Sequence, residues 1–242
     1  MSVDLAIQMV AIGLGAMLQV GVGIGFSIIA GPPMMILLGT STAVPVLLLL
    51  NTVVSVVATN RHVLNTDRQT IRTAIIGCLA GVVVGLAVYP WLTEAFVLAL
   101  TASLLLIGLL TTLLPLRRSV GTAGFLTISC LSGLATVWAA TPGPLMIFGL
   151  IAKGRGAKDV AKLVQPIALV GYGTAFLLHS LSTPQAFGYG LQIWGFVALT
   201  LISSLIGRRV RPVLPQTLVT TAIRVVSFLA CGVLFHRAFT IA

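Results

Sequence analysis

The sequence contains very few charged residues. Only 7% of its 242 residues are Asp, Glu, Lys or Arg, and just 4 residues are acidic. In soluble proteins about a quarter of the residues are charged. The scarcity of charge therefore excludes an ordinary soluble domain and favours a chain that is embedded in lipid.

The apolar segments contain no acidic residue. Asp4, Asp67, Glu94 and Asp159 all fall in expected loops or at the ends of apolar segments. Carriers of protons and cations usually place carboxylates in their pathway. This distribution disfavours a cation substrate, and it leaves proton coupling to His179 or to the substrate itself.

Groups that could carry catalysis or bind a metal are also scarce. His62, His179 and His236 lie at segment ends and far apart in the sequence, and there is no G-x-S-x-G or H-E-x-x-H motif. The three cysteines lie inside apolar segments without the spacing of metal ligands, which is typical of small buried side chains: Cys78, Cys130 and Cys231. We therefore expect neither an enzyme nor a bound cofactor.

Apolar residues make up 58% of the chain, and its mean hydropathy is +1.13. Runs of about 20 apolar residues, the length that crosses a bilayer as a helix, recur along the chain. The predicted spans are 5–27, 44–60, 71–91, 95–115, 120–140, 160–180, 189–207 and 215–237. Two apolar pieces, 32–39 and 144–152, are too short to cross. The sequence predicts an all-α polytopic membrane protein with eight spanning helices and two short ones.

The basic residues predict the orientation in the membrane. All but two of the 14 Lys and Arg residues fall in four clusters: Arg61, Arg68 and Arg72; Arg117 and Arg118; Lys153, Arg155, Lys158 and Lys162; Arg208, Arg209 and Arg211. Loops 40–43, 90–94 and 181–188 contain none. The positive-inside rule then puts the clusters in the cytoplasm and both termini on the outer side of the cell membrane. Because the net charge of +10 sits in such loops, nucleic acid is not an expected partner.

This orientation requires residues 5–39 and 119–152 each to enter and leave on the same side. Each stretch is therefore predicted to be a hairpin of one long helix, a break and a short helix. The breaks are expected at AGPP (30–33) and ATPGP (140–144), because glycine and proline permit them.

The two hairpins resemble each other in sequence. At a shift of 112 residues, Gly21, Gly31, Pro32 and Met34 match Gly133, Gly143, Pro144 and Met146. At a shift of 122 residues, Gly85 and Pro90 match Gly207 and Pro212. Corresponding loops fall on opposite sides of the membrane. We therefore predict two inverted repeats, 1–116 and 117–242, in one membrane domain.

Broken hairpins at membrane depth favour a binding site. Irregular backbone is tolerated there only where protein buries it or where it lines a wet cavity. The short helices would point free N–H groups and the positive end of their dipoles at one place, which suits an anion. The predicted substrate-binding residues are Gly31, Pro32, Pro33, Met34, Gly143, Pro144, Ser27, Thr141, Asn51 and Gln165. The alternative is that the glycines and prolines only permit close packing or a kink.

Two ionisable residues are candidates for a charge role. Arg224 lies inside the last predicted span, where it either serves function or reaches back to water as a snorkelling side chain. His179 lies near the outer end of its span, where it either titrates or makes an interfacial contact.

Several stretches resemble the sulfite exporter TauE/SafE family of sulfonate and sulfur-oxyanion permeases. They are GVGIGFSIIAGPPMMILLG (21–39), GFLTISCLSGLATVWAATPGP (124–144), GCLAGVVVG (77–85) and IGRRVRPVLPQTLVTTAIRVVSFLACG (206–232). The second glycine cluster departs from the family's denser G-x-G-G-P pattern. The resemblance implies a plasma-membrane transporter for sulfite, sulfonates or related organic anions.

The sequence thus predicts a secondary transporter that exports small anions by alternating access. A passive anion channel or a membrane partner that transports nothing is the alternative. The identity of the anion, the direction of transport, a coupling ion and the oligomeric state stay open at this point. Export is the easier direction because the membrane potential contributes roughly 2.3 kcal/mol per charge per 100 mV.

Overall fold

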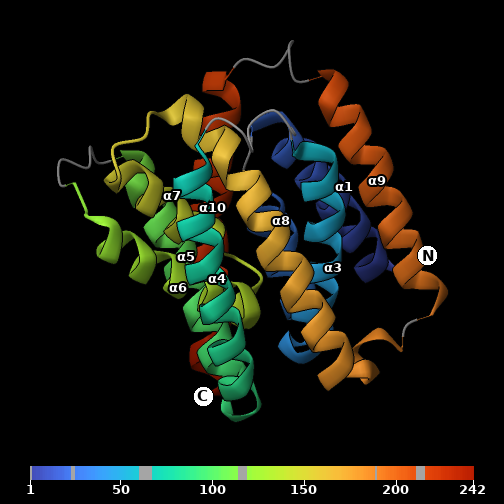
Figure 1. The fold of residues 1–242 in the computed structure, drawn as a ribbon. Coiled ribbons are helices and arrows are strands. Elements are labelled where there is room, and N and C mark those ends of the chain that lie inside the picture. Colours follow the sequence, from blue (N-terminus) through green and yellow to red (C-terminus); the bar gives the residue numbers. More distant parts are fainter. Residues whose placement is uncertain (1, 23–24, 60–66, 114–118, 189, 211–215) are drawn as a thin grey trace.

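The computed structural model describes residues 2–22, 25–59, 67–113, 119–188, 190–210 and 216–242 (Figure 1). Their regular structure is entirely helical. The α-helices are α1 (Val3–Val22), α2 (Phe26–Leu38), α3 (Thr40–Ala58), α4 (Arg68–Val88), α5 (Glu94–Leu113), α6 (Thr122–Ala139), α7 (Gly143–Ala152), α8 (Ala157–Ser182), α9 (Leu191–Val210) and α10 (Gln216–Ile241). Two short 3-10 helices, η2 (Tyr89–Trp91) and η3 (Pro184–Phe187), follow α4 and α8.

Seven helical stretches of the described chain are long and apolar enough to cross a membrane. They lie in α1, α3, α4 with η2, α6, α8, α9 and α10. The chain is therefore a multi-pass membrane protein, as predicted. The shorter apolar helices are α2, α7 and Glu94–Leu110 of α5. The predicted span 95–115 falls on α5, and its crossing stays a prediction.

The helices pack in four main pairs. α3 packs on α8, α5 on α10, α1 on α9 and α4 on α6, so every one of these pairs joins a helix before residue 117 to one after it. The beginnings of α4 and α8 and the end of α9, where many basic residues lie, are at the top of Figure 1, and η2 and η3 are at the bottom. Arg61, Arg117, Arg118 and Arg211 lie outside the described residues.

The α4–α6 pair is held together by glycines that let the two backbones touch. A Cβ atom on Gly77 would lie 2.7 Å from the carbonyl oxygen of Leu126, and one on Gly81 would collide with the carbonyl of Cys130. From the other side, a Cβ on Gly133 would collide with the carbonyl of Cys78. Small residues at such positions are the usual basis of close helix packing in membranes.

The first hairpin breaks earlier than the sequence predicts. α1 ends at Val22 and α2 begins at Phe26, after Gly25, whose φ of 145° suits only glycine. AGPP (30–33) lies inside α2, so the predicted break there and the predicted helix start at Pro32 are wrong. Proline is favoured in the first turn of a helix but is not confined to it. Inside a membrane helix, neighbouring helices can satisfy the backbone groups that an interior proline leaves free.

The second hairpin breaks where the sequence predicts. α6 ends at Ala139, Ala140 adopts the left-handed conformation with φ of 50°, and α7 begins at Gly143 with Pro144 in its first turn. Thr141 turns its N–H back to the carbonyl of Ala135 (3.3 Å), so α6 cannot continue. The helices that follow the two breaks begin at Phe26 and Gly143, which are 117 residues apart. The sequence matches between the hairpins have an offset of 112 residues instead.

Candidate functional site at the junction of the two hairpins

Ser27, in the first turn of α2, joins the two broken hairpins. Its hydroxyl donates a hydrogen bond of 2.6 Å to the carbonyl of Ala140, in the break between α6 and α7. Both residues are buried. The N-terminus of α2 and the break before α7 are therefore in direct contact inside the helix bundle.

Two crossing helices supply the remaining partners of Ser27. The Nδ2 group of Asn51 on α3 donates to the Ser27 hydroxyl at 3.0 Å, and Asn51 is fully buried. The side chain of Tyr172 on α8 lies close enough to Ser27 to interact with it as well. The junction thus gathers neutral polar groups from α2, α3, α6 and α8.

Tyr172 was not among the residues expected from the sequence. A signal for it exists, because Asn51 follows Pro45 by six residues and Tyr172 follows Pro166 by the same interval. Both prolines lie inside their helices, and those helices pack on each other. Tyr172 thus has the same position relative to the proline of α8 as Asn51 has relative to the proline of α3.

Side chains also fasten each break. Gln19 of α1 accepts the N–H of Phe26 (3.0 Å) through Oε1 and so caps the start of α2. In the second hairpin the hydroxyl of Ser132 donates to the carbonyl of Pro142 at 3.0 Å, and that of Thr141 donates to the carbonyl of Ala139 at 2.7 Å. These contacts hold the two chain breaks in fixed positions without any charged group.

Gly31 lies one turn after Ser27, on the same side of α2. It is buried, yet a Cβ atom built on it would meet no atom of the described residues within 4 Å. The Cβ position of this buried glycine is thus open on the side of α2 that also carries Ser27. The open space is therefore next to the polar junction and not at the packed α4–α6 interface.

His179 of α8 contacts the end of α6, next to the second break. Its side chain is fully buried, and Nε2 lies 3.0 Å from the carbonyl oxygen of Val137, near the end of α6. Because a carbonyl only accepts, Nε2 carries the proton in this contact. The ring of Tyr89 packs edge-on against His179 at 4.6 Å. The histidine thus caps a carbonyl near the helix end, which favours the contact role over the titrating one.

The other predicted site residues lie at different distances from the junction. Met34 and Pro32 are buried within α2, Pro33 is half-buried, and Pro144 lies in the first turn of α7. Gln165 is buried seven residues before Tyr172, or roughly 10 Å of helix rise. Arg224 is half-buried on α10.

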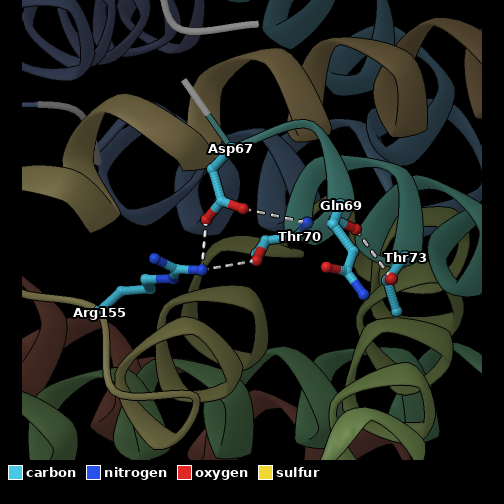
Figure 2. Close-up of polar contacts among 5 residues, drawn as sticks. All are labelled: Asp67, Gln69, Thr70, Thr73 and Arg155. Carbon is cyan, nitrogen blue, oxygen red and sulfur yellow. Dashed lines mark hydrogen bonds and ion pairs between the residues drawn. The ribbon is translucent and has the colours of Figure 1, made fainter. Parts of the chain in front are cut away.

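A second contact joins the two halves of the chain near the top of Figure 1. Arg155, in the link between α7 and α8, forms an ion pair of 2.6 Å with Asp67 and donates a hydrogen bond of 3.0 Å to the hydroxyl of Thr70 (Figure 2). Asp67 also caps α4 by accepting the N–H of Thr70 at 3.3 Å. This contact is partly exposed, in contrast to the junction at Ser27.

The described residues contain no group of three His, Cys, Asp or Glu side chains that could hold a metal ion. A surface depression exists at the end of α9, lined by Ile202, Leu205, Ile206, Arg208 and Arg209. Its apolar wall is exposed, as a lipid-facing surface would be. We regard the Ser27 junction as the candidate site because polar groups from both hairpins converge there.

One comparison with known proteins gives a match. A family described as Sulfite exporter TauE/SafE matches residues 8–234. The chain belongs to the sulfite exporter TauE/SafE family. No curated protein and no solved structure matches the chain significantly. As a member of this transporter family, the protein is a membrane transporter whose family acts on sulfur oxyanions, and the family match covers nearly the whole chain.

Proposed function

We propose that this protein is a secondary transporter that exports sulfite, sulfonates or related sulfur oxyanions across the cell membrane by alternating access. The observation that carries the proposal is the contact of Ser27 with Ala140, which brings the N-terminus of α2 to the break before α7. A site at the meeting point of two broken hairpins is the usual position of substrate in such carriers.

Two inverted repeats, α1–α5 and α6–α10, are part of the proposal. If the halves are exchanged, α1 corresponds to α6, α2 to α7, α3 to α8, α4 to α9 and α5 to α10. The α1–α9 pair then becomes the α6–α4 pair, and the α2–α10 pair becomes the α7–α5 pair; all four pairs pack together. The α3–α8 and α5–α10 pairs each map onto themselves. This exchange supports a two-fold relation between the halves.

Recognition of the anion rests on neutral donors. The amide groups in the first turns of α2 and α7 have no partner within their own helices, and each helix has its positive dipole end there. The Ser27 hydroxyl donates to Ala140, and the Asn51 amide donates to Ser27 at 3.0 Å and to the carbonyl of Leu47 at 2.8 Å, so each would exchange one of these hydrogen bonds to donate to an oxyanion. Gly31 leaves space beside them. Such a site binds negative charge without a buried cation that would have to be desolvated.

Export follows from the membrane potential, which drives an anion out of a cell with a negative interior. The pathway therefore needs no proton-binding carboxylate. In reconstituted vesicles an imposed potential should drive saturable sulfite flux, and substrate on the far side should stimulate it. Flux that appears only under a proton gradient would contradict this mechanism. Flux without saturation or trans-stimulation would indicate a channel.

A thermal-shift experiment tests the binding site directly. Purified protein is heated with sulfite, sulfate, thiosulfate, methanesulfonate or acetate, because a ligand that binds the folded state raises its apparent stability. We expect a shift with one of the sulfur oxyanions and its loss in Gly31→Leu, whose side chain fills the space beside Ser27. Gly195→Leu is the matched control, since Gly195 is exposed on α9 and also has nothing within 4 Å of a Cβ. An unchanged shift in Gly31→Leu would place the site elsewhere.

A further inference from the structure

Three fully buried hydroxyl groups have no hydrogen-bond partner within the part of the chain that the structure describes. They belong to Ser55 on α3 and to Thr200 and Ser204 on α9, and each residue has 0% relative exposure. Leaving a buried hydroxyl without a partner costs about 1–3 kcal/mol. Three such groups on two helices that pack together call for an explanation.

Other hydroxyl groups in the helix bundle avoid that cost. Thr52 on α3 donates to the carbonyl of Leu48 at 2.7 Å, and Thr136 on α6 donates to that of Ser132 at 2.7 Å. Serine and threonine in helices commonly bond to a carbonyl four residues earlier in this way. The hydroxyl groups of Ser55, Thr200 and Ser204 do not form this hydrogen bond to the carbonyl four residues earlier. They are therefore available to another partner.

The three hydroxyls follow the candidate site along the two helices. Ser55 is one turn after Asn51, on the same side of α3. Thr200 and Ser204 are one turn apart on α9, and Arg208 continues that row as an exposed side chain in the last turn. The ends of α3 and α9 point the same way in Figure 1. The row therefore leads from the Ser27 junction to the end of α9 that is predicted to be cytoplasmic.

The neighbouring row on α9 has a different role. The hydroxyl of Ser203 lies 3.4 Å from the Cβ position of Gly13, and a Cβ on Gly207 would lie 2.6 Å from the carbonyl oxygen of Met17. Ser203 and Gly207 thus face α1. Relative to Ser203, Ser204 lies about 100° and Thr200 about 60° further round the helix in the same direction, and α3 is the other helix packed closely on α9. Their hydroxyls are buried on the α3 side.

We propose that three hydroxyl groups line the route of the anion between the Ser27 junction and the side of the membrane on which Arg208 lies. They are those of Ser55, Thr200 and Ser204. The inference rests on the proposed function and assigns these residues to its cytoplasmic pathway. Hydroxyl groups donate to an oxyanion without trapping it, because they carry no charge. Arg208 at the mouth attracts anions from solution.

Cysteine accessibility tests the route in the full-length protein. Cys78, Cys130 and Cys231 are first replaced by alanine, and flux confirms that this background works. Single Ser55→Cys, Thr200→Cys and Ser204→Cys variants in vesicles are then exposed to a charged, membrane-impermeant methanethiosulfonate reagent. We expect all three to react and methanesulfonate to slow the reaction. Ser203→Cys, on the row that faces α1, is the matched control and should stay unreactive. Reaction no faster than in this control would overturn the route.

Substitutions that remove only the hydroxyl separate the route from the binding site. Thr200→Val combined with Ser204→Ala should lower flux about tenfold, the equivalent of roughly one net hydrogen bond, while the thermal shift with the anion stays unchanged. Thr52→Val, which removes a hydroxyl bonded to its own helix, is the control. Unchanged flux in the double variant would overturn the route and leave the proposed function standing. Absence of any anion shift in the unsubstituted protein would instead reject the proposed function.

Discussion

The hydroxyl of Ser27 donates a hydrogen bond of 2.6 Å to the carbonyl of Ala140, which lies 113 residues further along the chain. One partner is in the first turn of α2 and the other in the break between α6 and α7. Any motion that separates the two hairpins must break this bond. The hydrogen bonds of Ser27 therefore depend both on the bound substrate and on the relative position of the two halves.

Replacing Ser27 by alanine should destabilise the protein. The carbonyl of Ala140 and the Nδ2 group of Asn51 would lose a buried partner, which costs about 1–3 kcal/mol. Reversible unfolding in detergent measures the change. Ser41→Ala, at an exposed site near the start of α3, is the control and should be neutral. Equal stability of the two variants would show that the junction contributes nothing to folding.

Gly81→Ala should be among the most damaging small substitutions in the chain. The added Cβ would collide with the backbone carbonyl of Cys130, so α4 and α6 would have to move apart. Overpacking of this kind costs about 3 kcal/mol. Gly195→Ala makes the same chemical change at an exposed site of α9 with open space and should be neutral or slightly stabilising. Thermal unfolding of the two purified variants distinguishes them, and similar melting temperatures would refute the packing argument.

His179→Ala should destabilise the second break. Its Nε2 group is 3.0 Å from the carbonyl oxygen of Val137, and removal leaves that buried acceptor without its donor and also deletes the edge contact with Tyr89. We expect a loss of about 2–3 kcal/mol. His236→Ala removes an exposed histidine from α10 and serves as the control. If both variants unfold alike, the cap on α6 is energetically unimportant.

The ion pair between Asp67 and Arg155 should contribute little and should weaken in salt. The two side chains are 18% and 38% exposed, respectively, and solvent screening holds such pairs to about 1 kcal/mol or less. A double-mutant cycle with Asp67→Asn and Arg155→Gln measures their coupling, because asparagine retains the cap on α4. The coupling energy should fall between low and high ionic strength. A coupling that is large and independent of salt would mean that the pair is far better shielded than its exposure implies.

The sequence predicted the membrane class, the approximate position of seven spans and the second break for direct physical reasons. Long apolar runs with few charges can be stable only in lipid, and ATPGP stops α6 because proline lacks an N–H and disfavours a helical conformation in the residue before it. The first break lies before the position that the sequence predicts, because Pro32 and Pro33 do not start a helix although adjacent prolines are typical of a helix start. They lie inside α2, where neighbouring helices compensate for the missing hydrogen bonds.

The candidate site was predicted only in part. Ser27 and Asn51 meet as partners, whereas Tyr172 was missed and Gln165 lies elsewhere on α8. A polar residue in a membrane helix is visible in the sequence, but the partner that it faces depends on where two helices cross. Equal spacing from Pro45 and Pro166 is the one local signal that relates Asn51 to Tyr172.

The amino-acid sequence by itself determined that this chain is embedded in a bilayer and that two of its segments form hairpins. Hydropathy and helix breaking are local properties of the sequence. Only the tertiary structure decided that Ser27 reaches Ala140, that Gly81 touches Cys130 and that the buried hydroxyls of Thr200 and Ser204 have no hydrogen-bond partner among the described residues. Those facts depend on the rotation and crossing of helices far apart in sequence, which no local pattern specifies.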